Sequence, residues 1–449
     1  MKVLALWATF IGLSFLSSDA YSQRKVLSYD STKHSSRISK AIIKLDIQKD
    51  FGAIPNDTIN DHAAFQAASD FINRRKGYCE LVIPAGKYIV GKQEKLNNRD
   101  YYYRGIDVIQ IINAKNVTIK GEVGSILKYD TGFKFGSFNP EDGSSSNITM
   151  DCSPKTKTTS NKRADLGRCI LIASSSNVTI ENLELDGNFY SETLNNMNSY
   201  KMKCMDEKNP SFDPNKINIG GGYGDCGIQL AHYGVFVSHS GDVVLRKVTV
   251  RRFGLDGVQI ANSHSEPGQK NVKVIQCKLD FNARTALALT GGDKIEITGT
   301  SMTNTGRCLY ASTGTGVDIE AQVDAKRKEK LVTNVKFTDC DFSNNSSGEI
   351  LAKFGLGSSN VTFEGCDIKS SSRAINLGRK NTGYRFVNNK ISGSKVVLVE
   401  DKKVDIRENV LPKSTRNQGA SKNEKSLKSA SSLRTGPEPN VFENNVLVD

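Results

Sequence analysis

Long apolar runs are scarce in this 449-residue sequence, and so is histidine, of which there are five. A membrane-spanning helix needs about 18 consecutive apolar residues. After the N-terminus no apolar stretch is that long, so we expect no membrane span. His232, His239 and His264 lie close together in the chain, but their spacing matches no compact metal-ligand motif. Because no Asp-x-Asp-x-Asp cluster occurs either, we expect no cofactor, with Ca²⁺ kept as an alternative that no motif supports.

Residues that favour helices are also few, whereas Gly, Asn, Ser and Thr are abundant. The chain is 37% hydrophobic and 8% aromatic and contains 38 glycines, a composition that suits many short strands joined by turns. The net charge of +13 would attract an acidic partner such as an acidic polysaccharide or a nucleic acid. Since no aromatic and basic platform for stacking bases is visible, we expect a polysaccharide partner and no nucleic acid.

The N-terminus has the features of an export signal. Lys2 is followed by the apolar run Val3–Leu16, and small residues at Ser18 and Ala20, or at Ala20 and Ser22, offer cleavage sites. We therefore expect a secreted or periplasmic protein, and a buried N-terminal helix is the alternative.

One eight-residue pattern recurs along most of the chain: apolar, any, apolar, two spacers, small or polar, any, apolar. Successive copies start 65, 29, 23, 40, 26, 23 and 20 residues apart, so the basic unit is 20–26 residues and longer intervals contain loops or two units. Repeats of this length with period-two alternation predict a β-solenoid whose coils stack on one another. The copies are Val178–Leu185, Val243–Val250, Val272–Leu279, Ile295–Met302, Val335–Phe342, Val361–Ile368, Tyr384–Ile391 and Val404–Leu411.

The sixth position of the pattern predicts an inward stack of small side chains. Nine cysteines occur in the chain, so at least one is unpaired. For the three cysteines of this stack we favour packed free thiols over disulfides, and for its asparagines a ladder of amides. The residues at this position are Leu183, Val248, Cys277, Thr300, Cys340, Cys366, Asn389 and Asn409.

Two motifs precede the repeats: DFGAIPNDTINDHAAFQAA at 50–68 and LVIPAGKY at 81–88. They resemble the opening of the pectate-lyase-like superfamily, and the resemblance covers about residues 46–411. It implies an all-β fold, a right-handed parallel β-helix solenoid with an N-terminal capping helix after Asp61. The motifs indicate the fold but not the chemistry, because lyases, hydrolases, epimerases and phage tailspikes share them.

The residues themselves agree with a capping helix. Asn60 or Asp61 can cap its N-terminus, and an apolar stripe at helical spacing can cover the open end of the solenoid. The stripe consists of Ala64, Phe65, Ala68, Phe71 and Ile72.

The expected segments follow from these signals. Polar, cysteine-bearing insertions at about 137–166 and 188–226 interrupt the early coils, and loops of this size are usually functional or disordered. The segments are a signal peptide at 1–22, an N-terminal extension at 23–45, the β-helix at 46–411, a flexible polar segment at 412–439 and a final rung at 440–449.

After each core repeat a second short strand follows, and its alternation points polar residues outward in one line. Such a line beside a stacked sheet predicts a groove for a polymer. The pattern fits a monomer and a trimer equally, so both oligomeric states are kept as alternatives. The outward residues are Gln229, Gln259, Ala288, Asp318, Glu320 and Asn376.

In this region the chain is similar to the polygalacturonases, which carry N-T-D-x-x-D, G-D-D, G-H-G and R-x-K on successive coils. Only Asp256 matches the first motif. Arg284 and Thr285 stand in place of the paired aspartates, Thr315 replaces the histidine, and Lys353 lies near the fourth motif without its arginine. The resemblance therefore implies the scaffold without that mechanism, because hydrolysis needs an acid and a base.

A different pair of carboxylates is present. Asp318 and Glu320 lie two residues apart on one strand, roughly 6.5–7 Å by strand geometry, which fits the roughly 6.5–9.5 Å of inverting glycosidases. Asp256 lies about two coils away, on the order of 10 Å. We expect a glycoside hydrolase in which Glu320 is the acid and Asp318 or Asp256 activates water; solvated carboxylates on a polar strand are the structural alternative.

A polysaccharide lyase is the competing hypothesis. In a lyase, cationic side chains would neutralise the carboxylate of a uronate, and Tyr233 or His232 would be the base that removes a proton from the sugar. A non-catalytic glycan-binding or surface-structural β-helix is the third alternative. The substrate-binding candidates are Gln229, His232, Tyr233, Arg252, Gln259, Arg284, Lys353 and Arg373.

Overall fold

A computed structural model gives the fold of one compact unit within Ser35–Asp449. The predicted signal peptide, most of the predicted extension, Gln229, Asn409 and the polar segment at 412–439 lie outside the described residues. The structure describes residues 41–96, 101–133, 136–138, 162–164, 166–188, 232–307, 313–324, 327–370, 373–378, 380–392, 395–398, 404–406, 440–443 and 446–448.

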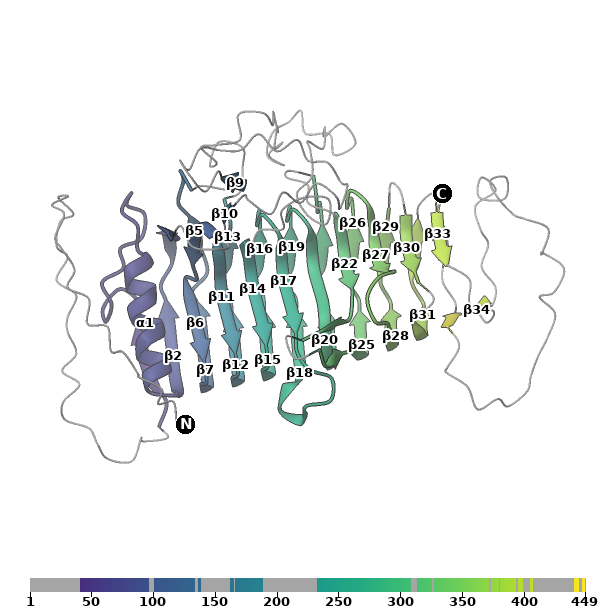
Figure 1. Cartoon of the computed structure of the whole chain (residues 1–449), viewed down its shortest axis with the longest axis horizontal. Helices are drawn as coiled ribbons and strands as arrows, with labels where there is room; N and C mark the ends of the chain where they lie inside the picture. The colour runs from purple at the N-terminus through teal and green to yellow at the C-terminus, as the bar shows by residue number, and fades with distance from the viewer. Residues whose placement is uncertain are drawn as a thin grey trace, which may run out of the picture. The chain divides into compact units, whose positions relative to one another are not determined.

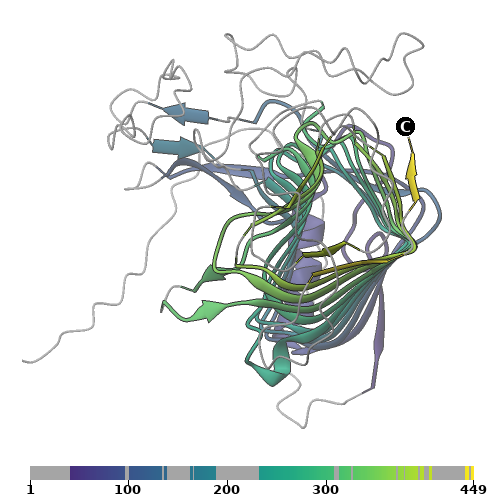
Figure 2. The ribbon, with the colours of Figure 1, turned by 90° about the vertical axis from the view of Figure 1, so that its right-hand side faces the viewer.

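The described chain is a right-handed parallel β-helix, as the sequence predicts. Its strands stack side by side (Figure 1), and an end-on view shows three sheets around a common interior (Figure 2). We name them sheets A, B and C. Sheets A and C join through β20 into one 20-stranded sheet.

Sheet A carries the strands that the apolar repeat predicts, and each is parallel to its neighbour. Its strands are β1 (Ile43–Asp46), β2 (Gly77–Ile83), β7 (Lys115–Gly121), β12 (Ser176–Glu181), β15 (Gly241–Arg246), β18 (Lys270–Ile275), the second half of β20 (Thr285–Thr298), β25 (Val332–Thr338), β28 (Ser358–Glu364), β31 (Thr382–Val387), β34 (Val404–Ile406) and β35 (Asn440–Glu443).

Sheet B holds the ends of the same repeats. Its strands are β3 (Gly86–Val90), β8 (Ser125–Tyr129), β13 (Glu184–Asp186), β16 (Thr249–Arg251), β19 (Lys278–Asp280), β21 (Ser301–Thr303), β26 (Asp341–Ser343), β29 (Asp367–Lys369), β32 (Lys390–Ser392) and β36 (Val446–Val448). β35 and β36 form the rung that follows β31 and β32. The repeat predicts Val404–Leu411 in that place and 440–449 as the last rung, but among the described residues β34 pairs with β35 and not with β31.

Sheet C contains the strands on which the groove is predicted. They are β6 (Ile109–Ile112), β11 (Gly167–Ala173), β14 (His232–Ser238), β17 (Asp256–Ala261), the first half of β20, β22 (Thr315–Ile319), β27 (Gly348–Ala352), β30 (Arg373–Leu377) and β33 (Lys395–Leu398). Outside the three sheets lie β4 (Lys92–Lys95), β5 (Tyr101–Ile106), β9 (Gly136–Phe138), β10 (Lys162–Ala164), β23 (Gln322–Val323), β24 (Glu329–Lys330), the short 3₁₀ helix η4 (Pro267–Gln269) and the α-helix α1 (His62–Arg74).

The register of sheet A confirms the winding inferred from the repeat. Val243 pairs with Val272, and Val272 pairs with Ile295. The intervals of 65 and 40 residues each span a single coil with an insertion, because Val178 pairs directly with Val243 and Ile295 directly with Val335.

The predicted inward stack is also present. Every described member is at most 4% exposed, and side chains bond from coil to coil: Thr300 Oγ1 accepts from the Cys277 N–H at 3.2 Å, and Asn389 Oδ1 from the Cys366 N–H at 2.8 Å. The five described cysteines are free thiols, so the stack is held by packing and hydrogen bonds.

Helix α1 caps the first strand of sheet C and lies at one end of the stack (Figure 1). Asn73 accepts from the Ile112 N–H at 2.8 Å and donates to the Gln110 carbonyl at 3.0 Å, while Ser69 Oγ accepts from the Gln110 N–H at 3.0 Å. These bonds satisfy backbone groups at the edge of β6 that would otherwise attract another strand.

The start of α1 differs in detail from the prediction. Asp61 occupies the N-cap position, but its side chain makes no capping bond and instead accepts from the Ile54 N–H at 2.9 Å. Asn60 Oδ1 accepts from the His62 N–H at 2.9 Å. In the part of the chain that the structure describes, no helix is long and apolar enough to cross a membrane.

Candidate functional site

Near the start of several strands of sheet C, one residue faces the interior where strict alternation would point it outward, and we call this position the bend. A Cβ at Gly257 would lie 2.5 Å from Asn282 Nδ2, and one at Gly316 would lie 2.8 Å from Asn345 Nδ2; both asparagines are fully buried. The residue at the bend is therefore small on most strands of sheet C. Glu349, which is fully buried, is the exception.

The residues on either side of the bend form two rows across successive strands, which we call the groove face. Register aligns Asp256, Thr285, Thr315 and Gly348 in the first row, which continues to Arg373 on β30. The second row contains four of the six residues of the predicted line, Gln259, Ala288, Asp318 and Asn376, and register adds Leu351 between the last two. Residues of both rows line one cavity, so the two rows face the same side.

Asp256 is held in place by its neighbours on the next strand. Arg284 donates from Nε to Asp256 Oδ1 at 2.9 Å, and Thr285 donates to the same oxygen at 2.7 Å. Burial raises the pKa of Asp256, and Arg284 and Thr285 oppose that rise. The pKa of Arg284 is lowered by burial but raised further by Asp256, Tyr233 and Asp318; these three groups therefore lie within electrostatic reach of Arg284.

Asp318 and Glu320 occupy the middle of the groove face. Asp318 lies between Ala288 and Leu351 of the adjacent strands and is 2% exposed. Glu320 follows the last residue of β22, is partly exposed, and extends the ladder because its N–H donates to the Leu289 carbonyl at 2.9 Å. Of the two carboxylates, Glu320 is the more accessible to solvent.

A cavity of about 210 Å³ adjoins this centre over β27 and β30. Lys353 and Arg373, both named from the sequence, line it together with Phe354 and Asn376. Lys353 Nζ lies 5.3 Å from the centre of the Phe354 ring, which is 48% exposed. Sequence reasoning missed Phe354, although an aromatic residue directly after an outward lysine at a strand end was an available signal.

An aromatic pair lies on β14, on the other side of Asp256. The rings of Tyr233 and Phe236 are 5.2 Å apart, edge to face, and Phe236 continues the second row because it pairs with Gln259. The Arg168 guanidinium lies 5.4 Å from the Phe236 ring and is fixed by Asp107 at 2.8 Å. Sequence reasoning found Tyr233 but missed Phe236 and Arg168, which lie outside the repeat used to find the groove.

His232 and Arg252, also named from the sequence, lie away from the groove face. His232 is fully buried, packs against Tyr129 at 4.7 Å and Phe253 at 4.9 Å, and accepts from the Gly254 N–H at 2.9 Å. Burial lowers the pKa of His232 to about 3, so its imidazole is neutral at physiological pH and does not reach a bound polymer.

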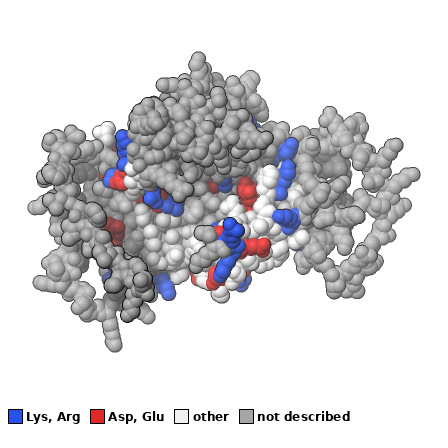
Figure 3. Space-filling model, in the orientation of Figure 1, with Lys and Arg blue, Asp and Glu red and all other residues white. Residues whose placement is uncertain are grey.

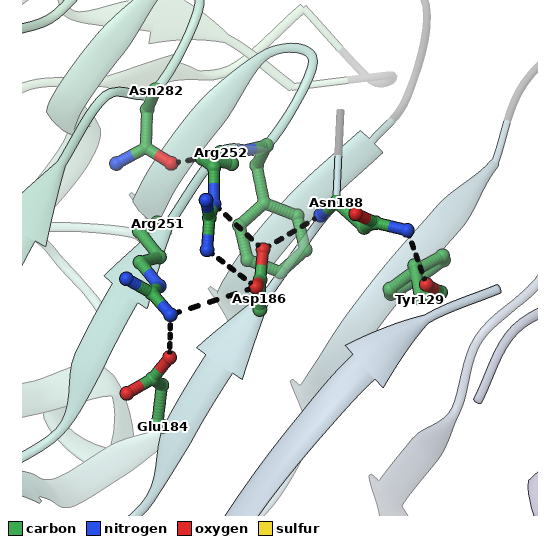
Figure 4. A network of polar contacts seen from close by, with 8 residues as sticks. Tyr129, Glu184, Asp186, Asn188, Arg251, Arg252 and Asn282 are labelled. Carbon is green, nitrogen blue, oxygen red and sulfur yellow. Dashed lines mark hydrogen bonds and ion pairs between the residues drawn. The ribbon is translucent and has the colours of Figure 1, made fainter. Parts of the chain in front are cut away.

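Arg252 belongs to a network of ion pairs at the end of sheet B (Figure 4). It donates to both oxygens of the buried Asp186, at 3.0 and 2.7 Å. Arg251 lies 3.7 Å from the same carboxylate and also pairs with Glu184. A guanidinium engaged at two oxygens is a structural cross-link between coils.

The surface charge is distributed in small groups. In the view of Figure 3, basic and acidic side chains of the described residues lie next to one another in small groups, with uncharged surface between the groups. Several charges pair along sheet A, such as Lys336 with Glu364 at 2.7 Å and Lys273 with Glu296 at 2.8 Å. Within the described ranges, no group of three or more His, Cys, Asp or Glu side chains could hold a metal ion.

The chain matches the family described as the right handed beta helix region over residues 146–320 and 266–420. It therefore belongs to this family, and its fold is of the pectate-lyase-like type. No curated protein sequence matches the chain.

Solved structures with a similar fold are distant. A Geobacillus virus E2 protein, ORF18, is 12% identical with a TM-score of 0.38 over 78% of this chain and 57% of its own. An ι-carrageenase bound to ι-carrageenan fragments is 14% identical, with a TM-score of 0.41 and the same coverage. A tailspike of Acinetobacter baumannii bacteriophage Fri1, gp49, a capsular polysaccharide depolymerase, is 14% identical, with a TM-score of 0.37 over 78% of this chain and 55% of its own. This chain thus spans a little over half the length of each.

Proposed function

We propose that this protein is a polysaccharide-degrading glycoside hydrolase that holds its polymer along the groove face of sheet C. The observation that carries the proposal is the alignment of two outward rows across successive strands, which gathers an aromatic pair, carboxylates and a cation-lined cavity on one side. An extended row of such groups suits a chain of sugars better than a small molecule. The apolar N-terminal run supports the further proposal that the enzyme is exported.

In the proposed reaction Glu320 is the general acid and Asp318 the general base. Glu320 gives its proton to the glycosidic oxygen as the bond to the anomeric carbon breaks. Asp318 removes a proton from the water whose oxygen forms the new bond to that carbon. Because the two residues are two positions apart along an extended strand, roughly 6.5–7 Å, they fit the roughly 6.5–9.5 Å spacing of inverting enzymes. Asp256, held by Arg284 and Thr285, is a positioning residue that fixes the Arg284 guanidinium beside this centre.

A panel of neutral and acidic polysaccharides tests the proposal. We expect wild-type protein to release new reducing ends from at least one polymer without a rise in ultraviolet absorbance, and Glu320→Gln to abolish the release. Binding of a polymer without any cleavage would contradict the hydrolase and leave a glycan-binding protein.

A lyase is the second candidate, favoured by one observation. Among the described residues, neither Lys353 nor Arg373 forms an ion pair with a carboxylate, so both are available to neutralise a uronate. Tyr233, whose ring contacts Phe236 of the second row, would be the base. In that case cleavage creates a C=C bond, and ultraviolet absorbance rises together with the reducing ends.

A further inference from the structure

The cavity over β27 and β30 differs from the rest of the groove face in its charge. Lys353 and Arg373 both line it, and no acidic side chain is among its described lining residues. Elsewhere basic side chains are commonly paired, as Arg284 is with Asp256 and Lys336 with Glu364. Two exposed cations at one cavity without a carboxylate partner among the described residues mark a place that attracts an anion.

The polar groups of the wall offer partners for the hydroxyl groups of a sugar that carries such an anion. Asn376 is 8% exposed and lines the cavity, and its Oδ1 has no hydrogen-bond partner within the described chain. Thr315, on β22, lines the same space. A buried amide oxygen without a partner is costly, and because this oxygen only accepts hydrogen bonds, a sugar hydroxyl that donates to Asn376 Oδ1 would offset that cost.

The chemistry of the two cations indicates which anionic groups the cavity can bind. A guanidinium presents a planar fork that matches the paired oxygens of a carboxylate or a sulfate, and a lysine adds a point charge. Phe354, 48% exposed at the rim, offers an apolar face on which a sugar ring can stack. The volume of about 210 Å³ has room for one sugar residue.

We propose that this cavity is a subsite for one anionic sugar, whose carboxylate or sulfate ester is bound by Lys353 and Arg373 while Phe354 stacks on the ring. The inference rests on the proposed function only in placing the polymer along the groove face. It makes the preferred polymer an acidic one, with a charged residue next to the Asp318 and Glu320 centre.

Binding measurements on the whole protein test the subsite without requiring cleavage. Calorimetry compares oligosaccharides of a hexuronate, their carboxyl-reduced forms, sulfated galactan oligosaccharides and their desulfated forms. We expect wild-type protein to bind one anionic series at least tenfold more tightly than its neutral counterpart, and the two series separate carboxylate from sulfate. Lys353→Met and Arg373→Met each lower the anionic affinity about tenfold, and the affinity falls with added salt.

Matched variants on other sheets exclude a general charge effect. Lys390, exposed on sheet B, and Arg246, with 46% of its side chain exposed on sheet A, are changed to Met and should leave the affinities unchanged. Equal binding of charged and neutral oligosaccharides, or anionic binding that survives the Lys353→Met/Arg373→Met double change, would overturn the subsite. Cleavage of an acidic polymer by that double variant at the wild-type rate would remove the subsite and keep the hydrolase. Anionic binding that depends on both cations, without cleavage of any polymer, would keep the subsite and remove the hydrolase.

Discussion

Arg284 donates a hydrogen bond from Nε to Oδ1 of Asp256 at 2.9 Å, and less than a tenth of either side chain is exposed. The two residues lie on successive coils, so the pair joins the strand that carries Asp256 to the strand that follows it. A buried ion pair of this kind fixes geometry more than it adds stability, because both charges have lost their hydration.

Arg284→Leu should be strongly destabilising, because it leaves the Asp256 carboxylate buried without its cation. We expect a loss of roughly 3–5 kcal/mol, the usual cost of removing one partner of a buried pair, measured as a lower urea midpoint. The double change Asp256→Asn with Arg284→Leu should recover part of that loss. A midpoint of Arg284→Leu equal to that of wild type would contradict this role of the pair.

The winding of the chain could be predicted from the sequence because it depends on a local and repeated pattern. Spacing alone placed Val243, Val272 and Ile295 in register, and alternation alone placed Gln259, Asp318 and Asn376 in one outward row. Both depend on the period of two that a half-buried strand imposes.

Contacts between distant segments could not be predicted in the same way. His232 reads as a groove residue by position, but the bend of sheet C and the ring of Tyr129, more than 100 residues earlier, place it in the core. The same bend turns Glu349 inward. The cavity beside Lys353 needed the three-dimensional arrangement of β22, β27 and β30, because its lining residues come from all three strands.

The cap on β6 gives a second prediction. Asn73→Ala removes the acceptor of the Ile112 N–H and the donor to the Gln110 carbonyl, which should cost about 1–3 kcal/mol and increase aggregation because the strand edge becomes available. Asp70→Ala, an exposed position on the same helix, is the control for the change in helix propensity. If both variants unfold at the same midpoint and remain equally soluble, α1 does not act through Asn73.

Glu349 makes the stability depend on pH in a specific direction. Burial raises its pKa from 4.5 to about 8 in the folded protein, against hydrogen bonds from Asn345 and Ser370 and the attraction of Arg307. Between these two values the folded state keeps a proton that the unfolded chain has lost, so stability falls as pH rises. The contribution is complete below pH 4.5 and is lost by the time the pH passes about 8.

Glu349→Gln tests this dependence because its amide stays neutral throughout. Denaturant midpoints measured from pH 5 to 8.5 should decline less in the variant than in wild type, and the variant should gain stability relative to wild type as the pH rises. Parallel pH profiles for the two proteins would show that Glu349 ionises at an ordinary pKa in the folded state.

The initial rate of reducing-end release by Glu320→Gln tests most directly the central claim, that Glu320 on the groove face is the general acid. Glu296→Gln is the matched control. Glu296 is an outward carboxylate on sheet A, 56% exposed and paired with Lys273, so it controls for the loss of one surface charge. On a polymer that wild-type protein cleaves, we expect Glu320→Gln to be slowed about 10²–10⁴-fold, the usual contribution of a general acid, and Glu296→Gln to retain the wild-type rate. A wild-type rate in Glu320→Gln would contradict the placement of catalysis on the groove face at this residue.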